Sequence, residues 1–271
     1  YEFARDKALL DVCVHQGNDF QITSEFWQWL NELSAEFTVD EEFIVFPGWE
    51  WSGNTGLGGD RNILHLHEGR QIHRSSHALV DDLSDTDTDC NSANDLFEAL
   101  KGEDCVVFAH IGGRYADIKI AHDGGLERAV EVHSAWGTFE WLMADCFAAG
   151  HRVGVVANSD GHKGRPGASY PGASEFGAYG GLTCFLMDRL ARDDLFSCLR
   201  KRRHYATTGN RMLIDLSVEG DFDRYDVDPK VAPRQPNRCN SLEMGDIAHS
   251  HDNTANLSFS VQADAPILQV D

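Results

Sequence analysis

The chain has 271 residues, of which 42% are apolar and 25% charged, a composition typical of globular proteins long enough to bury a full core. Its formal net charge is −21, from 44 acidic and 23 basic residues. Because a nucleic-acid-binding protein normally carries a basic face, this balance argues against nucleic acid and against anionic membranes as partners.

No apolar run approaches the roughly 18 residues that a membrane-spanning helix needs. The seven cysteines are scattered without a Cys-x-x-Cys pair, which favours reduced thiols and a cytoplasmic location. The chain opens at Tyr1 inside an expected helix, so we expect its natural start to lie further upstream.

Short apolar segments and amphipathic segments alternate along the first 203 residues. Strands are expected at 10–14, 43–46, 61–67, 105–108, 126–133, 153–157 and 182–187. Helices are expected at about 24–37, 93–101, 139–150 and 192–202, the first with Thr23 or Ser24 as its N-cap. This alternation predicts an α/β fold with mainly parallel strands.

Three segments depart from this alternation. Residues 68–94 are polar and carry five crowded aspartates, which we interpret as a solvated, mobile excursion. Residues 164–181 form a long glycine-rich loop that we expect to be a lid or rim. After residue 210, segments 213–218 and 257–261 alternate like antiparallel strands. We therefore expect an α/β domain at 1–210 and a partial β-rich extension at 211–271.

Histidine and acidic side chains recur where the predicted strands end. In parallel α/β barrels these ends carry the reactive residues, and carboxylate with imidazole suits a divalent metal such as zinc or manganese. The plain alternatives are a salt bridge, a structural histidine or a surface turn. Convergence of all these groups on one rim favours a metal site. The candidate positions are Glu50, His65, His110, His133, Asp160 and His162.

Four segments, in this order, resemble motifs of the PHP superfamily, which is named for polymerase and histidinol phosphatase. They are Pro47-Gly48-Trp49-Glu50, Phe108-Ala109-His110, Val130-Glu131-Val132-His133 and Asn158-Ser159-Asp160-Gly161-His162. The resemblance covers about residues 1–210 and implies a distorted seven-stranded β/α barrel. It also implies up to three metals at the C-terminal rim and phosphoesterase activity. The run 202–209 resembles an uncharacterised branch with a short β region after the barrel.

The resemblance gives individual residues a role. Glu50 is similar to the carboxylate that bridges two metals, and His110 to a ligand of the second metal. Asp160 resembles a ligand of the first metal and His162 one of the third. His65 is the best match to a further histidine ligand that the family often has after the glutamate.

Three other positions follow from the same resemblance. Asp60 competes with His65 for the additional ligand position. Glu131 resembles a family glutamate near the site. His133 replaces a residue that is often asparagine, and it is either a ligand or a group that orients one.

Two departures from the family pattern affect the number of metals. The His-x-His of the first family strand is absent from this sequence, and we expect it upstream of Tyr1. Where the second strand usually ends in Thr-Asp-His-Asn, this chain reads His15-Gln16-Gly17-Asn18-Asp19. Either His15 substitutes as a ligand, or two ions bind instead of three. Zinc, manganese and iron are the candidate metals.

The chemistry expected of such a site is metal-assisted hydrolysis of a phosphoester in a small anionic substrate. Two ions bridged by Glu50 would lower the pKa of a shared water toward about 7 and neutralise charge on the phosphoryl oxygens. Arg114 and Arg165 are the candidate phosphate contacts, with surface salt bridges as the alternative. His133, with Glu131 nearby, is the candidate proton donor to the leaving group.

Two other functions stay open at the level of sequence. A metal-dependent hydrolase could act on an amide, a lactone or a sugar-derived bond, because a fold does not fix its chemistry. A degenerate domain that has lost its metals could instead serve binding or structure, and the altered segment at 15–19 supports that alternative.

Overall fold

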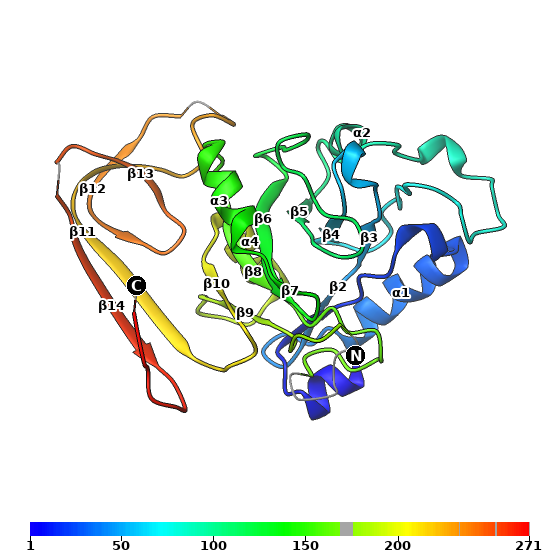
Figure 1. Cartoon of the computed structure of the whole chain (residues 1–271), viewed down its shortest axis with the longest axis horizontal. Coiled ribbons are helices and arrows are strands. Elements are labelled where there is room, and N and C mark those ends of the chain that lie inside the picture. The colour runs from blue at the N-terminus through cyan, green and yellow to red at the C-terminus, as the bar shows by residue number, and fades with distance from the viewer. Residues whose placement is uncertain (169–175, 233, 253, 271) are drawn as a thin grey trace.

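The structure is a computed structural model of the 271-residue chain, and it describes residues 1–168, 176–232, 234–252 and 254–270. Residues 169–175, which belong to the loop predicted at 164–181, lie outside the described residues. Figure 1 shows an α/β body that includes the N-terminus, with a β-sheet at its side that leads to the C-terminus.

A six-stranded mixed sheet forms the centre of the α/β body. β3 (Gly48–Trp51), β4 (Arg61–His65) and β5 (Cys105–Ala109) are antiparallel neighbours. β6 (Glu127–Ser134) runs parallel to β5, β8 (Gly154–Ala157) runs parallel to β6, and β7 (Gly137–Thr138) folds back on β6. Every residue of β3, β4 and β5 is buried, so the polar residues among them need partners inside the protein or in a bound molecule.

Two smaller strand pairs flank this sheet. β1 (Val12–Val14) is parallel to β2 (Ile44–Phe46), and β9 (Leu182–Phe185) is antiparallel to β10 (His204–Thr207). The described strands thus form separate sheets and no closed barrel. The prediction of mainly parallel strands is wrong around β4, because the short connection from β3 returns the chain as an antiparallel hairpin. The coarser prediction of a mixed α/β fold is confirmed.

Within the described residues, four α-helices cover the sheets: α1 (Ser24–Phe37), α2 (Ala93–Ala99), α3 (Glu140–Ala148) and α4 (Arg192–Lys201). Short helical turns lie at Phe3–Lys7 (η1), Asp19–Gln21 (η2), Thr55–Leu57 (η3) and Thr86–Thr88 (η4). The four α-helices predicted between residues 24 and 202 are confirmed, whereas the helix expected around Tyr1 is only the five-residue turn η1. Thr23 caps α1, because its hydroxyl accepts a hydrogen bond from Phe26 N at 3.1 Å.

Two apolar cores lie on opposite faces of the central sheet, since successive side chains of a strand point to opposite sides. Trp49 and Trp51 pack with residues of α1 and α2 in one core. Leu64 and Phe108 pack with residues of α4 in the other. Glu50, between the two tryptophans, lies on the α4 side, where it lines a cavity with Leu64 and Phe108.

Arg192, the first residue of α4, ties distant parts of the body together. Its Nη2 donates hydrogen bonds to the backbone oxygens of Val45 at 2.6 Å and Ser34 at 3.2 Å, and to Thr38 Oγ1 at 2.9 Å. Its Nη1 pairs with Glu68 Oε1 at 2.7 Å. One guanidinium therefore holds α1, β2 and the segment after β4 against α4.

The segment between β4 and α2 differs from the solvated excursion expected from its composition. Arg74 is fully buried, donates to Ile22 O at 3.1 Å and pairs with Asp85 at 2.5 Å. His77 lies between Asp85 and Asp89, at 2.9 Å from each. The acidic residues of this segment therefore hold it folded on itself instead of only solvating it, and Arg74 connects it to the body through Ile22 O.

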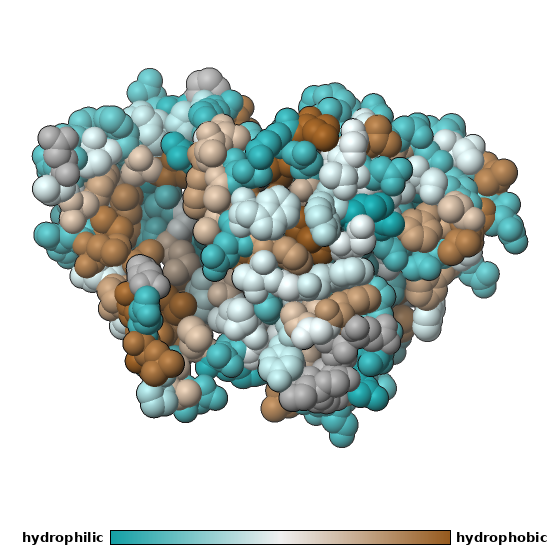
Figure 2. Space-filling model, in the orientation of Figure 1, coloured by the Kyte–Doolittle hydropathy of each residue, from teal (hydrophilic) through white to brown (hydrophobic). Residues whose placement is uncertain are grey.

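The residues after 210 form a four-stranded antiparallel sheet built on one long strand. β11 (Leu213–Tyr225) pairs with β12 (Asn237–Glu243), β13 (Ile247–Ser250) and β14 (Asn256–Gln262). The two segments expected to be antiparallel strands pair with each other, as β11 and β14. Leu257 and Phe259 of β14 are exposed, and Figure 2 shows apolar surface over this sheet. The domain boundary at 210 stays a prediction.

In the part of the chain that the structure describes, no helix is both long enough and apolar enough to cross a membrane. The cytoplasmic location and the exclusion of nucleic acid and membranes stay predictions from composition.

Candidate functional site

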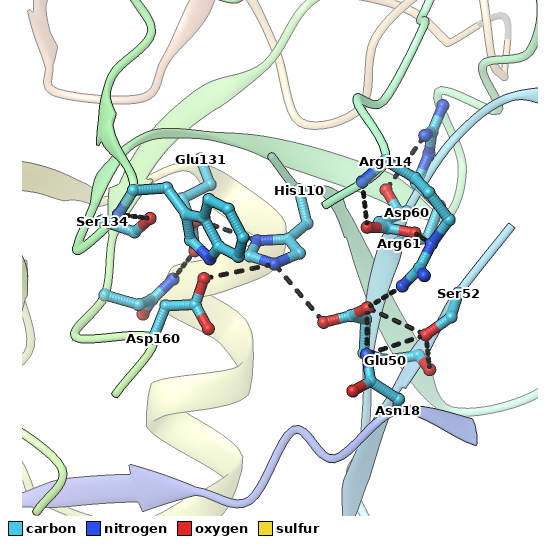
Figure 3. A network of polar contacts seen from close by, with 12 residues as sticks. Asn18, Glu50, Ser52, Asp60, Arg61, His110, Arg114, Glu131, Ser134 and Asp160 are labelled. Atoms are coloured by element: carbon cyan, nitrogen blue, oxygen red, sulfur yellow. Dashed lines mark hydrogen bonds and ion pairs between the residues drawn. The ribbon is translucent and has the colours of Figure 1, made fainter. Parts of the chain in front are cut away.

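Polar side chains from four strands meet at one edge of the central sheet (Figure 3). Glu50 comes from β3 and Glu131 from β6, His110 directly follows β5, and Asp160 lies three residues after the end of β8. Glu50, His110 and Glu131 are almost completely buried. The structure thus brings together three of the predicted metal ligands and the glutamate expected near them.

His110 is the centre of this cluster. Its Nδ1 lies 2.8 Å from Glu131 Oε1, and its Nε2 lies 3.4 Å from Glu50 Oε2 and 3.6 Å from Asp160 Oδ2. Burial by itself disfavours a charged imidazole, but the neighbouring Glu131 and Glu50 carboxylates outweigh it and raise the pKa of His110 well above its usual value. Glu131 also accepts a hydrogen bond from Asn158 Nδ2 at 2.5 Å, so it is held firmly behind the ring.

Glu50 is oriented by three donors that all reach the same oxygen. Asn18 Nδ2, Ser52 Oγ and Arg114 Nη2 lie 2.7, 2.9 and 3.2 Å from Oε1. Burial raises the pKa of Glu50, but His110, Ser52 and Arg114 together leave that pKa below its ordinary value. The other oxygen, Oε2, faces His110.

Asp60 and Arg114 extend the cluster. Arg114 Nε donates to Asp60 Oδ1 at 2.7 Å, and Arg114 N donates to Oδ2 at 3.2 Å. Burial and the nearby Glu50 charge raise the pKa of Asp60 to about 7, against the opposing effect of Arg114. Arg61 supports the loop before Asp60, because its Nη1 donates to the backbone oxygens of Gly58 at 2.7 Å and Gly59 at 3.2 Å.

Asp160 is held in a strained conformation. Its φ is +41°, in the left-handed region that costs a non-glycine residue free energy and that is often found at functional sites. Its Oδ2 is buried and has no hydrogen-bond partner within the described residues. Burial raises the pKa of Asp160 to about 7, with His110 acting in the opposite direction.

The cluster agrees with a divalent metal in donor chemistry and in pair spacing. Two ligands of a tetrahedral ion with bonds of about 2.1 Å lie roughly 3.4 Å apart. The distances from His110 Nε2 to Glu50 and Asp160, 3.4 and 3.6 Å, are close to this value. A carboxylate behind the other ring nitrogen, as Glu131 provides, is the usual support of a metal-binding histidine.

The same cluster lacks, among the residues that the structure describes, the set of three or more converging ligands that a complete metal site has. Within the described residues, no group of three or more His, Cys, Asp or Glu side chains converges so that it could hold a metal ion. The structure therefore provides donor pairs around His110, and the number of metals stays a prediction.

His65 does not join the cluster. Because β4 is antiparallel to β3 and β5, its C-terminal end lies at the opposite edge of the sheet, where His65 is opposite Cys105. Its ring stacks on Trp49 at 5.2 Å, and burial lowers its pKa to about 3. Asp60, which precedes β4, reaches the cluster in place of His65, and its assignment as the additional ligand stays a prediction.

Other predicted residues also lie outside the network of Figure 3. His162 is largely exposed, with Nδ1 3.2 Å from the backbone oxygen of Asp160. His15 borders the cavity, accepts a hydrogen bond from Gly17 N at 3.3 Å and packs edge-on against Phe26. Arg165 lies exposed in the loop after Asp160.

Both ring nitrogens of His133 lie within hydrogen-bond distance of protein atoms. Its Nδ1 lies 2.7 Å from Thr138 Oγ1, and its Nε2 lies 2.9 Å from Tyr179 O. Since both ring nitrogens are held by the protein, this geometry argues against the predicted proton donation by His133. The histidine links the end of β6 to the loop before β9.

Sequence reasoning missed the amide and hydroxyl groups of the cluster. Asn18, Ser52 and Asn158 orient the two glutamates. Asn18 lies in the segment 15–19, whose departure from the family motif drew attention to His15 instead. For Asn158, the sequence signal that could have identified it is its position directly after a strand and two residues before Asp160.

The fold and cluster define a mixed α/β protein with a buried imidazole–carboxylate site. No family model matches the chain. It is similar to uncharacterised proteins of Chlamydia pneumoniae (22% identity, 74% of this chain and 34% of the relative) and Chlamydia trachomatis (21% identity, 80% and 37%). The chain thus spans about a third of the length of these curated relatives.

The chain also matches a solved structure from Bacteroides vulgatus. It is described as a two-domain protein containing a predicted PHP-like metal-dependent phosphoesterase. The comparison covers 98% of this chain and 82% of that one, at 10% identity and a TM-score of 0.44.

Proposed function

We propose that the protein is a metal-dependent hydrolase of phosphoesters. The observation that supports the proposal is the placement of His110: Glu131 holds one ring nitrogen at 2.8 Å, and the other lies between the Glu50 and Asp160 carboxylates. Asp160 Oδ2, which is buried without a hydrogen-bond partner within the described residues, is the carboxylate oxygen that a bound cation would satisfy.

In this proposal, Glu50, His110 and Asp160 bind the metal, with Asp60 close behind. When bound, a divalent ion supplies an activated water and neutralises charge on the phosphoryl group. Asn18 and Ser52 hold Glu50 in place, and Glu131 orients His110. Arg114 touches Glu50 and is partly exposed, so it is placed to contact an anionic phosphoryl oxygen.

The finer barrel architecture also belongs to the proposal. In the described structure β1 pairs only with β2 and β9 only with β10, and both strands line one cavity of about 1160 Å³.

The test is metal-dependent hydrolysis of p-nitrophenyl phosphate. We expect activity to vanish with a chelator and to return with Mn²⁺ or Zn²⁺, and His110→Gln to abolish both activity and metal retention. His251→Gln, a change on the C-terminal side of the molecule near Asp223, is the control and should retain both. Hydrolysis that is indifferent to chelation would overturn the proposal.

A second function is a binding domain that has lost its metals. The lack of three converging donors within the described residues favours it. Elemental analysis after purification in metal-containing buffer separates the two functions, because a degenerate domain retains no stoichiometric metal.

A further inference from the structure

The cavity beside the cluster has two carboxamide groups that the cluster does not use. Asn62 lies directly opposite Glu50 in the β3–β4 pair and is 3% exposed. Gln16 follows β1, and its Nε2 donates to Ile63 O at 3.1 Å. Both residues line the cavity of about 1160 Å³ that also borders Glu50, His110 and Asp160.

The oxygens of these carboxamides are unpaired. Within the described residues, Asn62 Oδ1 and Gln16 Oε1 are buried without a hydrogen-bond partner. A buried acceptor without a donor destabilises the folded state. An apolar residue of similar size at position 62 would avoid this cost, so the polar group indicates a ligand that supplies the donor.

The surroundings indicate what kind of donor fits. The oxygens are neutral acceptors and the neighbouring Glu50 is a carboxylate, so a second anionic group is disfavoured near them. Leu64, Phe108 and Val156 line the same cavity and offer apolar walls to a carbon skeleton. Hydroxyl groups on a short carbon chain satisfy both conditions.

We propose that Asn62 and Gln16 determine specificity by accepting hydrogen bonds from hydroxyl groups of the substrate's alcohol portion. This inference rests on the proposed phosphoesterase function, and it assigns the substrate to the class of polyol phosphates. The phosphoryl group lies toward His110 and Asp160, and the hydroxylated portion lies toward Asn62 and Gln16, which all line the same cavity.

The first test is stability without ligand. Asn62→Leu removes an unpaired buried group, so we expect the Tm to rise by about 2–4 °C. Asn31→Leu is the matched control: Asn31 is also buried, but its Nδ2 donates to Trp27 O at 2.7 Å and its Oδ1 accepts from Gly69 N at 2.8 Å. That variant should lower the Tm. A fall in Tm for Asn62→Leu as well would show that Asn62 is structural and would overturn the inference.

The second test compares glycerol 1-phosphate with n-propyl phosphate, which has the same carbon chain without the two hydroxyls. In the presence of Mn²⁺, we expect the wild type to bind glycerol 1-phosphate about tenfold more tightly by calorimetry. Asn62→Leu should bring this ratio close to one. If an ordered water alone satisfies the two oxygens, the ratio is close to one already in the wild type, and the inference is wrong.

The two proposals fail in different ways. If neither ester is hydrolysed but glycerol 1-phosphate still binds preferentially through Asn62, the hydrolase proposal fails and the polyol site stands. If both esters are hydrolysed in a metal-dependent manner at equal KM, the hydrolase stands and the polyol site fails.

Discussion

At the scale of single residues, a substitution of Glu131 distinguishes the metal-dependent hydrolase from a binding domain that has lost its metals. Glu131 Oε1 holds His110 Nδ1 at 2.8 Å. Its role in the proposed hydrolase is to position the imidazole, and a residue of this kind affects metal binding through its neighbour.

We predict that Glu131→Gln weakens Mn²⁺ binding by about 10–100-fold, as loss of a supporting carboxylate does at other metal sites. The pKa of His110 should fall too, since the Glu131 charge contributes to raising it. Metal titration by calorimetry and histidine NMR measure the two effects. Glu140→Gln, on the exposed surface of α3, is the control. Unchanged metal affinity would exclude the positioning role.

Asp19 provides a prediction on pH dependence. Its carboxylate accepts hydrogen bonds from Phe20 N at 2.7 Å and Ser75 Oγ at 3.0 Å, yet burial still raises its pKa from 3.8 to about 6. The folded state therefore holds this proton more tightly than the unfolded state. Its stabilising effect is complete below pH 3.8 and is lost as pH rises to about 6.

We therefore expect the unfolding free energy of the wild type, relative to that of Asp19→Asn, to fall by about 2 kcal/mol between pH 4 and pH 6, since the full pKa shift corresponds to about 3 kcal/mol at 1.36 kcal/mol per pKa unit. Urea unfolding of both proteins across this range measures the difference. A difference that grows with pH would mean that Asp19 is stabilised as the anion.

At the scale of elements, the loop before β4 places Asp60 in the cluster. Gly59 has a φ of +76°, and a Cβ at this position would lie only 1.9 Å from Tyr115 O. The loop can approach the backbone of Tyr115 only because residue 59 has no side chain.

We predict that Gly59→Ala destabilises the protein by at least about 2 kcal/mol, from backbone strain together with the clash. Gly56→Ala in η3 is the control, because its added Cβ would meet nothing within 4 Å. That change should be neutral or slightly stabilising. Thermal unfolding of both variants tests the comparison, and equal Tm values would contradict it.

The direction of β4 explains which site residues sequence could identify. Glu50, His110 and Asp160 were found because each lies at the C-terminal end of a strand at the same edge. His65 also ends a strand, but β4 is antiparallel, so the N-terminal end of β4 brings Asp60 and Asn62 to that edge. Strand direction depends on tertiary pairing, which the apolar pattern of a single strand does not encode.

The helices were more predictable than the sheet arrangement. The capping hydroxyl of Thr23 and the spacing of Trp27 and Leu30 are local signals that define α1. The closed barrel, by contrast, depended on contacts between strands far apart in sequence. The ion pairs of Arg74 and His77, which fix the acidic segment, were equally invisible in its composition.

At the scale of the whole molecule, the net charge of −21 destabilises the folded state through repulsion between like charges. We predict that raising NaCl from about 50 to 500 mM increases the Tm, since the Debye length falls from about 14 to 4 Å and screens repulsion between surface carboxylates. Differential scanning fluorimetry across this range is the measurement. A falling Tm would show that attractive ion pairs outweigh the excess negative charge.

The large sequence separation between Arg192 and the residues that it contacts has a consequence for folding during biosynthesis. The contact of Arg192 with Val45 spans 147 residues of sequence. At a translation rate of about 5–20 residues per second, the ribosome needs about 7–30 s to deliver the guanidinium after it has added Val45. During that interval the apolar strands β1 and β2 lack this anchor, so their unpaired edges stay open to misassociation while the rest of the chain is synthesised.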